Sequence, residues 1–346
     1  MLFFNFYTQF KKYLKFLFLF PFEILIFFCD LLKFKFYNVK NSEKSFQTFI
    51  RLFLITGGWS NNLVHKILLT NKILLKRSSS RDNIINNNKN IESFFQKGYF
   101  LKEDYIEQNQ LDCINNFLKK QLGYYRSEKI INSNKFTKLN INNPEAVAFH
   151  YRSSDLIKSK TIQNLLINNE ILGFVQNYLG SMPIIDLIEC WWSFPTSQPD
   201  KEVAQMWHFD MDRPKWVKVF IFLEDCNFNN GPHCFIEGSH KNNSLPFNIR
   251  KMGYSRIEDS EINKYFNSSK IKVFTAKKKT ILFEDTLGLH KGQKVQNGKR
   301  LILQFQYSSS LFGANTGKIL FPKDASDLFL AYKSKYKKMF SNFICQ

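Results

Sequence analysis

The period of the hydrophobic pattern changes at Pro183, and this change constrains the fold more than any other feature of the sequence. Before it, residues 102–122 and 161–179 carry apolar side chains at helical spacing, with Gly123 and Gly180 as expected C-terminal caps. Beyond Pro183 the spacing is that of strands, in residues 184–194, 203–209, 216–223, 271–275, 280–283 and 300–307. Helices followed by many short strands predict a mainly β fold with flanking helices.

The segment 216–223 indicates how the strands are arranged. Its side chains are apolar on both alternating faces except for Lys218. A strand of this kind is covered on both sides, so we expect it inside a sandwich or a closed barrel.

The length of 346 residues suits one large domain with an appendage. We expect a basic, hydrophobic helical extension in residues 1–90, with helices at 45–55 and 61–75 and a polar linker near 78–90. The main domain is expected in residues 91–320 and a C-terminal helical tail in residues 321–346. Six scattered cysteines without metal-ligand spacing favour a reducing, cytoplasmic setting.

The N-terminal extension has the composition of a membrane-contacting segment. Residues 16–29 are almost entirely apolar and have lysines on both sides, but Pro21 and Glu23 disfavour a helix that spans a bilayer. Residues 10–36 are therefore expected to bind peripherally at a membrane surface, where an apolar substrate would reside. A second interpretation stays open, in which this helix packs on the protein's own core.

The formal charge of +20 is concentrated near the N-terminus, where residues 1–90 hold 14 basic and 4 acidic side chains. Such a surplus suits an anionic surface, either phospholipid headgroups or nucleic acid. A solvated basic face explains it equally well. No base-reading motif accompanies the charge, so nucleic acid is not expected as a partner.

Two histidines and one aspartate form a candidate metal site. His208 and Asp210 are two residues apart, so on a strand both side chains leave the same face. His290 offers a third ligand 80 residues after Asp210. Two imidazoles and one carboxylate leave open positions on Fe(II), and this ligand set favours iron over zinc.

Arg300 is a candidate for binding an acidic cosubstrate. The dipeptide at 297–298 is Asn-Gly, the strongest short hairpin signal, so His290 and Arg300 are expected to flank one turn, with Arg300 opposite Val295. That position is too far to touch the metal but within reach of the far end of a dicarboxylate, which a guanidinium can bind through two parallel hydrogen bonds.

Two neighbours of His208 are candidates for the substrate pocket. We place Gln205 and Trp207 on the same face as His208, where they would line the pocket. Ordinary filling of the barrel interior is an equally good interpretation. One of Trp191 and Trp192 is expected to face inward, and their alternation does not decide which.

These motifs together resemble the phytanoyl-CoA dioxygenase family over roughly residues 95–312. The resemblance is carried by three runs: Trp-His-Phe-Asp at 207–210, Asn-Gly-Pro-His-Cys-Phe-Ile-Glu-Gly-Ser-His at 230–240, and Asp-Thr-x-Gly-x-His-Lys-Gly at 285–292 with Arg300. It implies a double-stranded β-helix, also called a jelly-roll or cupin-like core. It also implies that His208, Asp210 and His290 bind the metal and that Arg300 binds the distal carboxylate of 2-oxoglutarate.

The activity implied by the resemblance is that of an Fe(II)- and 2-oxoglutarate-dependent dioxygenase. Such an enzyme uses O2, with ascorbate as a reductant, and hydroxylates a small or lipid-like molecule while releasing succinate and CO2. One departure is Gly292, because relatives often carry a hydroxyl residue at that position. This departure keeps open a non-catalytic jelly-roll binding module, and the charge keeps open a nucleic-acid oxygenase.

Overall fold

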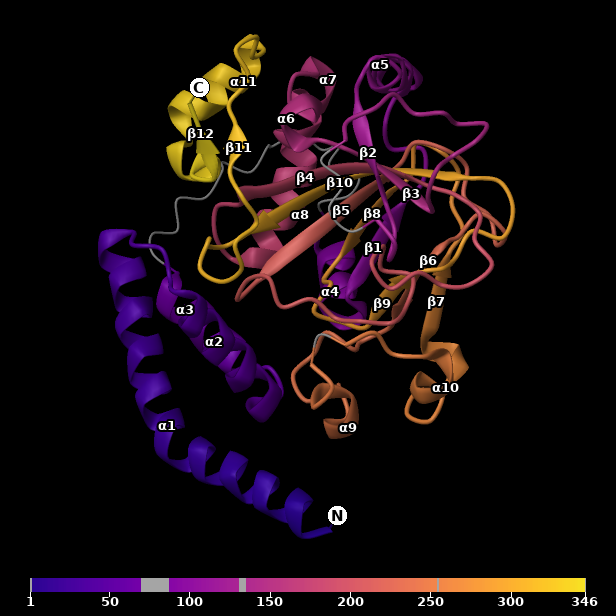
Figure 1. The fold of residues 1–346 in the computed structure, drawn as a ribbon. Coiled ribbons are helices and arrows are strands. Elements are labelled where there is room, and N and C mark those ends of the chain that lie inside the picture. Colours follow the sequence, from indigo (N-terminus) through magenta and orange to yellow (C-terminus); the bar gives the residue numbers. More distant parts are fainter. Residues whose placement is uncertain (1, 70–86, 131–134, 254, 346) are drawn as a thin grey trace.

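Two antiparallel β-sheets, with helices around them, form the body of the molecule (Figure 1). The computed structural model describes residues 2–69, 87–130, 135–253 and 255–345. The large sheet has the order β1 (Tyr99–Lys102), β8 (Ile281–Glu284), β5 (Trp216–Phe222), β10 (Arg300–Ser308), β4 (Ile184–Ser193), β3 (Ala148–Tyr151) and β2 (Gly123–Arg126). The small sheet has the order β7 (Ile271–Phe274), β6 (His233–Ile236) and β9 (His290–Gly292). The predicted jelly-roll core with flanking helices is confirmed, as two separate sheets and not as a closed barrel.

The helices flank this core on several sides. They are α1 (Leu2–Tyr37), α2 (Glu43–Thr56), α3 (Trp59–Leu68), α4 (Asn88–Lys97), α5 (Gln108–Leu118), α6 (Ser153–Leu156), α7 (Lys160–Leu166), α8 (Asn169–Leu179), α9 (Phe247–Arg250), α10 (Asp259–Ile262) and α11 (Asp327–Lys335). Two short 3-10 helices, η1 (Ser268–Lys270) and η2 (Lys337–Phe340), and the paired strands β11 (Ile319–Leu320) and β12 (Phe343–Ile344) complete the described elements.

Strand β5 shows how the two sheets and the helices share the core. Val217, Val219 and Ile221 belong to the large cluster that includes the buried residues of α7 and α8. The alternate residue Phe220 belongs to the cluster between the two sheets. Both faces of β5 are therefore covered, as the sequence predicted, and the polar exception Lys218 points to the interior between the sheets.

The region predicted as one helix at 161–179 is two helices, α7 and α8. The break falls at Asn168, whose side chain accepts hydrogen bonds from the backbone N–H groups of Glu170 at 2.9 Å and Ile171 at 3.2 Å. This is an N-cap, which starts a new helix. Gly180 ends α8 in the left-handed conformation with φ 66°, as predicted.

Three further sequence predictions need correction. The helix expected at 102–122 is confined to α5, and Gly123 begins β2, where a Cβ would lie 2.3 Å from the carbonyl oxygen of His150. Residues 203–209 form turns with single bridges at Trp207 and His208 and no continuous strand. The expected hairpin pairing of Arg300 with Val295 is wrong, because Val295 bridges other residues and Arg300 pairs with Ser193 of β4.

The first three helices pack against the jelly-roll. Phe27 of α1 and Phe49 of α2 are buried, and both rings contact Phe312, at 5.8 Å and 6.2 Å between centroids. Asn41 adds two hydrogen bonds to the backbone of Gly313, at 3.1 Å and 3.0 Å. The part of α1 around Phe27 therefore covers the protein's own core, and α1 runs along the outside of α2 and α3 (Figure 1).

The ends and the linker of the extension are only partly described. Most of the predicted linker, residues 78–86, and the end of the helix expected at 61–75 lie outside the described residues, and α4 begins directly afterwards. Among the described helices, none is both long enough and apolar enough to cross a membrane. Residues 321–346 contain α11, η2 and the short strand β12, which pairs with β11 just before them.

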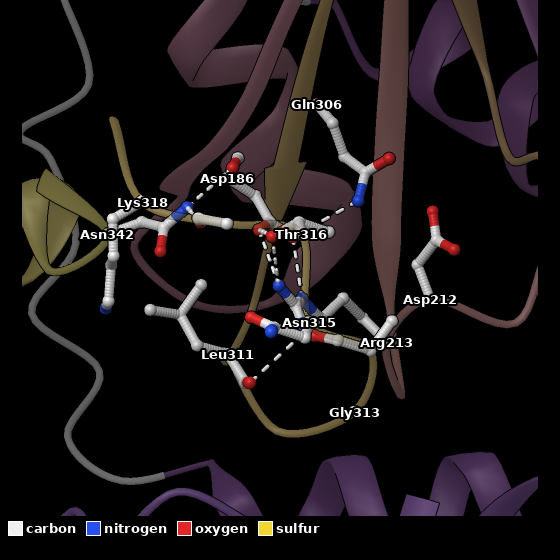
Figure 2. Close-up of polar contacts among 12 residues, drawn as sticks. Asp186, Asp212, Arg213, Gln306, Leu311, Gly313, Asn315, Thr316, Lys318 and Asn342 are labelled. Atoms are coloured by element: carbon white, nitrogen blue, oxygen red, sulfur yellow. Dashed lines mark hydrogen bonds and ion pairs between the residues drawn. The ribbon is translucent and has the colours of Figure 1, made fainter. Parts of the chain in front are cut away.

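A buried ion pair joins β4 to two later segments of the chain (Figure 2). The guanidinium of Arg213 donates to both carboxylate oxygens of Asp186, each at 2.7 Å, and both side chains are at most 2% exposed. Gln306 of β10 and Thr316 also donate to this carboxylate, at 3.1 Å and 2.9 Å. The cluster fixes the segment that follows Asp210 against the large sheet.

Candidate metal centre

Backbone pairing brings the two candidate histidine ligands together. His208 donates its N–H to the carbonyl of His290 at 3.0 Å, and His290 donates to the carbonyl of His208 at 2.9 Å. Asp210 is held two residues later by a hydrogen bond from its N–H to the carbonyl of Thr286 at 2.8 Å. One ligand atom from each of the three side chains lies within 4.8 Å of the other two.

Each imidazole has its Nε2 atom free for a metal. The Nδ1 atom of His208 lies 2.9 Å from the carbonyl of Met206, and that of His290 lies 2.9 Å from the carbonyl of Gly288. Because a carbonyl only accepts, Nδ1 carries the proton in both rings and Nε2 keeps its lone pair. Burial lowers the pKa of both histidines, so both are neutral, the form that binds metals.

The Asp210 carboxylate is charged and lies between both rings. Its oxygens are 3.9 Å from Nε2 of His208 and 3.5 Å from Nε2 of His290. Burial alone would raise its pKa, but the ammonium of Lys218, 2.6 Å away, holds the pKa well below the usual range. Burial raises the pKa of the neighbouring Asp212 to about 6, although Lys218 opposes the shift.

Arg300 carries a buried positive charge in the same cavity. Its guanidinium donates to the carbonyl of Gly231 and, at 3.2 Å, to the hydroxyl of Ser193, while its Nε atom has no partner. Within the described part of the chain, no carboxylate oxygen lies within 4.0 Å of it. A Cβ on Gly292 would come within 3.1 Å of Nη2, so glycine at this position leaves room for the guanidinium.

The candidate metal site and Arg300 line one cavity of about 230 Å³ between the two sheets. Most of the lining is polar: seven charged side chains, four histidines and Gln304 face four apolar side chains and a glycine. The charged side chains and histidines are Arg126, His150, Glu189, Glu202, His208, Asp210, Lys218, His233, Arg256, His290 and Arg300.

A neutral pair of side chains lies beside His290. Nε2 of His233 is 2.9 Å from both carboxyl oxygens of Glu284. Burial lowers the pKa of His233 to about 3 and raises the pKa of Glu284 to about 8. At neutral pH the contact is therefore a hydrogen bond from a protonated carboxyl group to a neutral imidazole.

The two predicted pocket residues lie elsewhere, which corrects their placement. Trp207 packs in the core beneath the N-terminal helices and donates its indole N–H to Asp259 at 2.6 Å. Gln205 accepts a hydrogen bond from the backbone of Asp200 at 2.9 Å. Side chains at odd positions here alternate with those of His208 and Asp210, so they leave the opposite face. Trp191 does line the cavity, whereas Trp192 packs in the outer core.

Sequence reasoning missed most of the polar residues that line the cavity, and three of them lie on the central strands of the large sheet. Lys218, Glu189 and Gln304 face inward from β5, β4 and β10. For Lys218 the sequence did carry a signal that it faces the cavity, because it is the polar exception in the apolar strand at 216–223. For the other two, only the register of the large sheet, which sets Gln304 opposite Glu189, reveals that they face the cavity.

A jelly-roll whose interior presents two imidazoles and one carboxylate to an open cavity is the architecture of mononuclear non-haem iron oxygenases. The sequence profile of the family described as "Phytanoyl-CoA dioxygenase (PhyH)" matches residues 94–294. This match covers more than half of the 346 residues, and the chain belongs to the phytanoyl-CoA dioxygenase family. The match and the site together support an oxygenase-type function that depends on iron and 2-oxoglutarate.

Solved structures of low sequence identity resemble the chain. EctD from S. alaskensis with bound Fe is 16% identical with a TM-score of 0.48, covering 69% of this chain and 82% of that one. HygX from Streptomyces hygroscopicus with nickel and 2-oxoglutarate is 13% identical with a TM-score of 0.46, covering 66% and 89%. The carbocyclase SnoK from nogalamycin biosynthesis is 10% identical with a TM-score of 0.46, covering 64% and 83%. Among curated proteins, no match was found.

Proposed function

We propose that this protein is an Fe(II)- and 2-oxoglutarate-dependent dioxygenase that hydroxylates a small organic substrate and releases succinate and CO2. The observation that carries the proposal is the convergence of His208, Asp210 and His290 in a cavity that also contains Arg300. Their order along the chain and their donor atoms match the ligand set that leaves vacant positions on iron.

The residues present fit both groups that the proposal requires. Two neutral imidazoles with free Nε2 atoms and one ionised carboxylate supply three donors with a single negative charge. The guanidinium of Arg300 is buried and has no carboxylate partner among the described residues, as expected of a group that receives an acidic cosubstrate. Gly292 does not weaken this fit, because its missing side chain leaves the space that Arg300 fills.

In this proposal each side chain has a defined task. His208, Asp210 and His290 would hold the iron, which when bound with 2-oxoglutarate supplies the activation of O2. The carbonyls of Met206 and Gly288 keep the two imidazoles oriented through Nδ1. Arg300 would fix the distal carboxylate of the cosubstrate, and the two sheets exclude water from the reacting groups.

The test is metal binding and 2-oxoglutarate turnover by the purified full chain. We expect it to bind Fe(II) anaerobically and to form succinate from 2-oxoglutarate in air. Asp210→Asn should reduce succinate formation by roughly 100-fold or more, since it removes the anionic ligand. Asp112→Asn on the exposed side of α5 is the matched control and should leave turnover unchanged. A chain that binds iron and 2-oxoglutarate without forming succinate would be a binding module instead.

We also propose peripheral membrane association through residues 10–36. The support is the outward face of α1, where Phe22, Leu25, Leu32 and Phe36 are exposed opposite the buried Phe27. Lysines at 33 and 35 would meet anionic headgroups at the same surface.

Vesicle binding tests the membrane proposal without disturbing the core. The variant changes Phe22, Leu25, Leu32 and Phe36 to Ser and keeps the buried face of the helix intact. We expect the full chain to bind vesicles that contain phosphatidylserine and the variant to bind at least tenfold more weakly. Equal binding by both proteins would remove the membrane proposal and leave the oxygenase proposal unaffected.

A further inference from the structure

The cavity contains one carboxylate without a basic partner, Glu189 of β4. Three acidic side chains line the cavity. Asp210 is paired with Lys218 at 2.6 Å, and Glu202 is paired with Arg126. Glu189 receives one hydrogen bond, from the amide of Gln304 at 3.2 Å, and no Lys, Arg or His nitrogen of the described residues lies within 4.0 Å of it.

Two aromatic side chains line the cavity near Glu189. Trp191 lies two residues further along β4, faces the same cavity, and is stacked on His150 with ring centroids 5.9 Å apart and planes 12° apart. Phe220 of β5 also lines the cavity, and it lies directly opposite Gln304 in the pairing of β5 with β10. Aromatic faces beside a carboxylate attract a positively charged group more strongly than a neutral one.

Glu189 is half-buried and has a single neutral hydrogen-bond donor, so a cation placed beside it would stabilise its charged form. Burial raises the pKa of Glu189, and the more distant charges of Lys218 and Arg126 only partly oppose this shift. A hydroxyl group would give the carboxylate a hydrogen bond but would leave its charge uncompensated, whereas an ammonium group supplies both.

We propose that Glu189 binds a protonated amine of the substrate, so that the substrate class is a compact, polar amine. This inference rests on the proposed oxygenase function, because it places the amine in the same cavity as the metal centre. A long hydrocarbon chain matches this cavity poorly, because seven charged side chains line it. Glu189 is thus a specificity-determining residue, and the lipid-like substrate class is disfavoured.

Three probes of equal length and different charge test the inference: butylammonium, 1-butanol and butyrate. Binding is measured by saturation-transfer NMR on the full chain, with and without Zn(II) and 2-oxoglutarate. With Zn(II) and 2-oxoglutarate present, so that the metal site and Arg300 are occupied, we expect butylammonium to bind at least tenfold more tightly than 1-butanol, and butyrate to bind most weakly. Glu189→Gln should weaken butylammonium binding at least tenfold and leave 1-butanol unchanged. Glu92→Gln, which removes an exposed carboxylate from α4, is the matched control and should change neither.

Two results would overturn the inference: equal binding of butylammonium and 1-butanol, or undiminished butylammonium binding by Glu189→Gln. If Glu189→Gln fails to fold, the comparison of the three probes on the unchanged chain still decides. Failure here differs from failure of the proposed function. A chain that forms succinate without preferring butylammonium contradicts the amine site alone, and a chain with the preference but no succinate contradicts the oxygenase alone.

Discussion

At the scale of single residues, Arg300 places a buried positive charge in the cavity without a carboxylate partner among the described residues. Its guanidinium is 6% exposed and hydrogen-bonds only to neutral acceptors. We expect Arg300→Lys to raise the Kd for 2-oxoglutarate by tenfold or more, equivalent to about 1.5–3 kcal/mol, because an ammonium cannot bind both oxygens of one carboxylate in parallel. Calorimetric titration of the metal-loaded protein with 2-oxoglutarate measures this change.

The neighbouring Lys299 provides the control for this prediction. It is exposed and directly precedes Arg300 in the chain, so Lys299→Gln removes a positive charge without changing the cavity. If Arg300→Lys and Lys299→Gln bind 2-oxoglutarate with the same Kd, Arg300 does not bind the carboxylate of the cosubstrate.

Residue types, spacing and the family resemblance were enough to predict that His208, Asp210 and His290 converge, but not the rest of the cavity. His208 and Asp210 are close in sequence, and the resemblance at 285–292 located His290. Glu189 carries no local signal, because its role depends on which strand lies beside β4. The error for Trp207 has a simpler cause, since side chains one residue apart in extended backbone leave opposite faces.

At the scale of elements, an aromatic cluster around Phe312 helps to hold α1 and α2 against the jelly-roll. Phe49 of α2 is fully buried against Phe27 and Phe312. We expect Phe49→Ala to lower the free energy of unfolding by about 3–5 kcal/mol, because it leaves a cavity between the helices and the core. Phe22→Ala is the matched control, since Phe22 is 66% exposed, and should change stability by less than about 0.5 kcal/mol. Urea unfolding curves distinguish the two, and equal midpoints would contradict the packing of α2.

The ion pair of Arg213 and Asp186 joins β4 to the segments at 306–316, so its loss should affect the large sheet (Figure 2). We expect Arg213→Met to cost about 3–5 kcal/mol, because it leaves the Asp186 carboxylate buried and without its main partner. The double variant Asp186→Leu with Arg213→Met should lose less than Arg213→Met alone. Thermal unfolding of both checks this prediction, and a double variant less stable than the single one would contradict it.

Element boundaries were predictable where a local signal fixes them. Strands β4, β5 and β10 matched the alternation of apolar residues, and Gly180 ended α8 as expected. The expected hairpin at 297–298 failed because the Asn-Gly signal is local, whereas pairing with β4 and β5 satisfies the backbone of β10 on both edges. The break between α7 and α8 depends on one capping asparagine inside an otherwise continuous helical pattern.

At the scale of the whole molecule, His65 links the N-terminal helices to the acid stability of the fold. It is buried in α3, its Nδ1 lies 3.0 Å from the hydroxyl of Ser309, and burial with the nearby Lys215 lowers its pKa to about 4. An unfolded histidine has a pKa of about 6.5, so between pH 6.5 and 4 the unfolded chain binds a proton that the folded chain does not. Stability should therefore fall as the pH falls through this range, by at most about 3 kcal/mol from this residue.

The variant His65→Asn tests this linkage, because an amide can still hydrogen-bond to Ser309 but does not titrate in this range. We expect unfolding free energies measured from pH 7 to pH 4 to decline less steeply in the variant, by roughly one bound proton. Parallel curves for the variant and the unchanged chain would show that His65 does not contribute.

The reciprocal backbone hydrogen bonds between His208 and His290 have a consequence for how such a centre can change. These hydrogen bonds join main-chain N–H and C=O groups, which every residue type other than proline possesses. The distance between positions 208 and 290 is therefore set by the backbone and not by the side chains. The backbone therefore keeps the two positions at the same distance whichever side chains they carry. Exchanging one imidazole for a carboxylate or a thiolate would alter the metal preference, while the distance between the two ligand positions would stay the same. New metal chemistry can therefore arise by single substitutions without a change of fold.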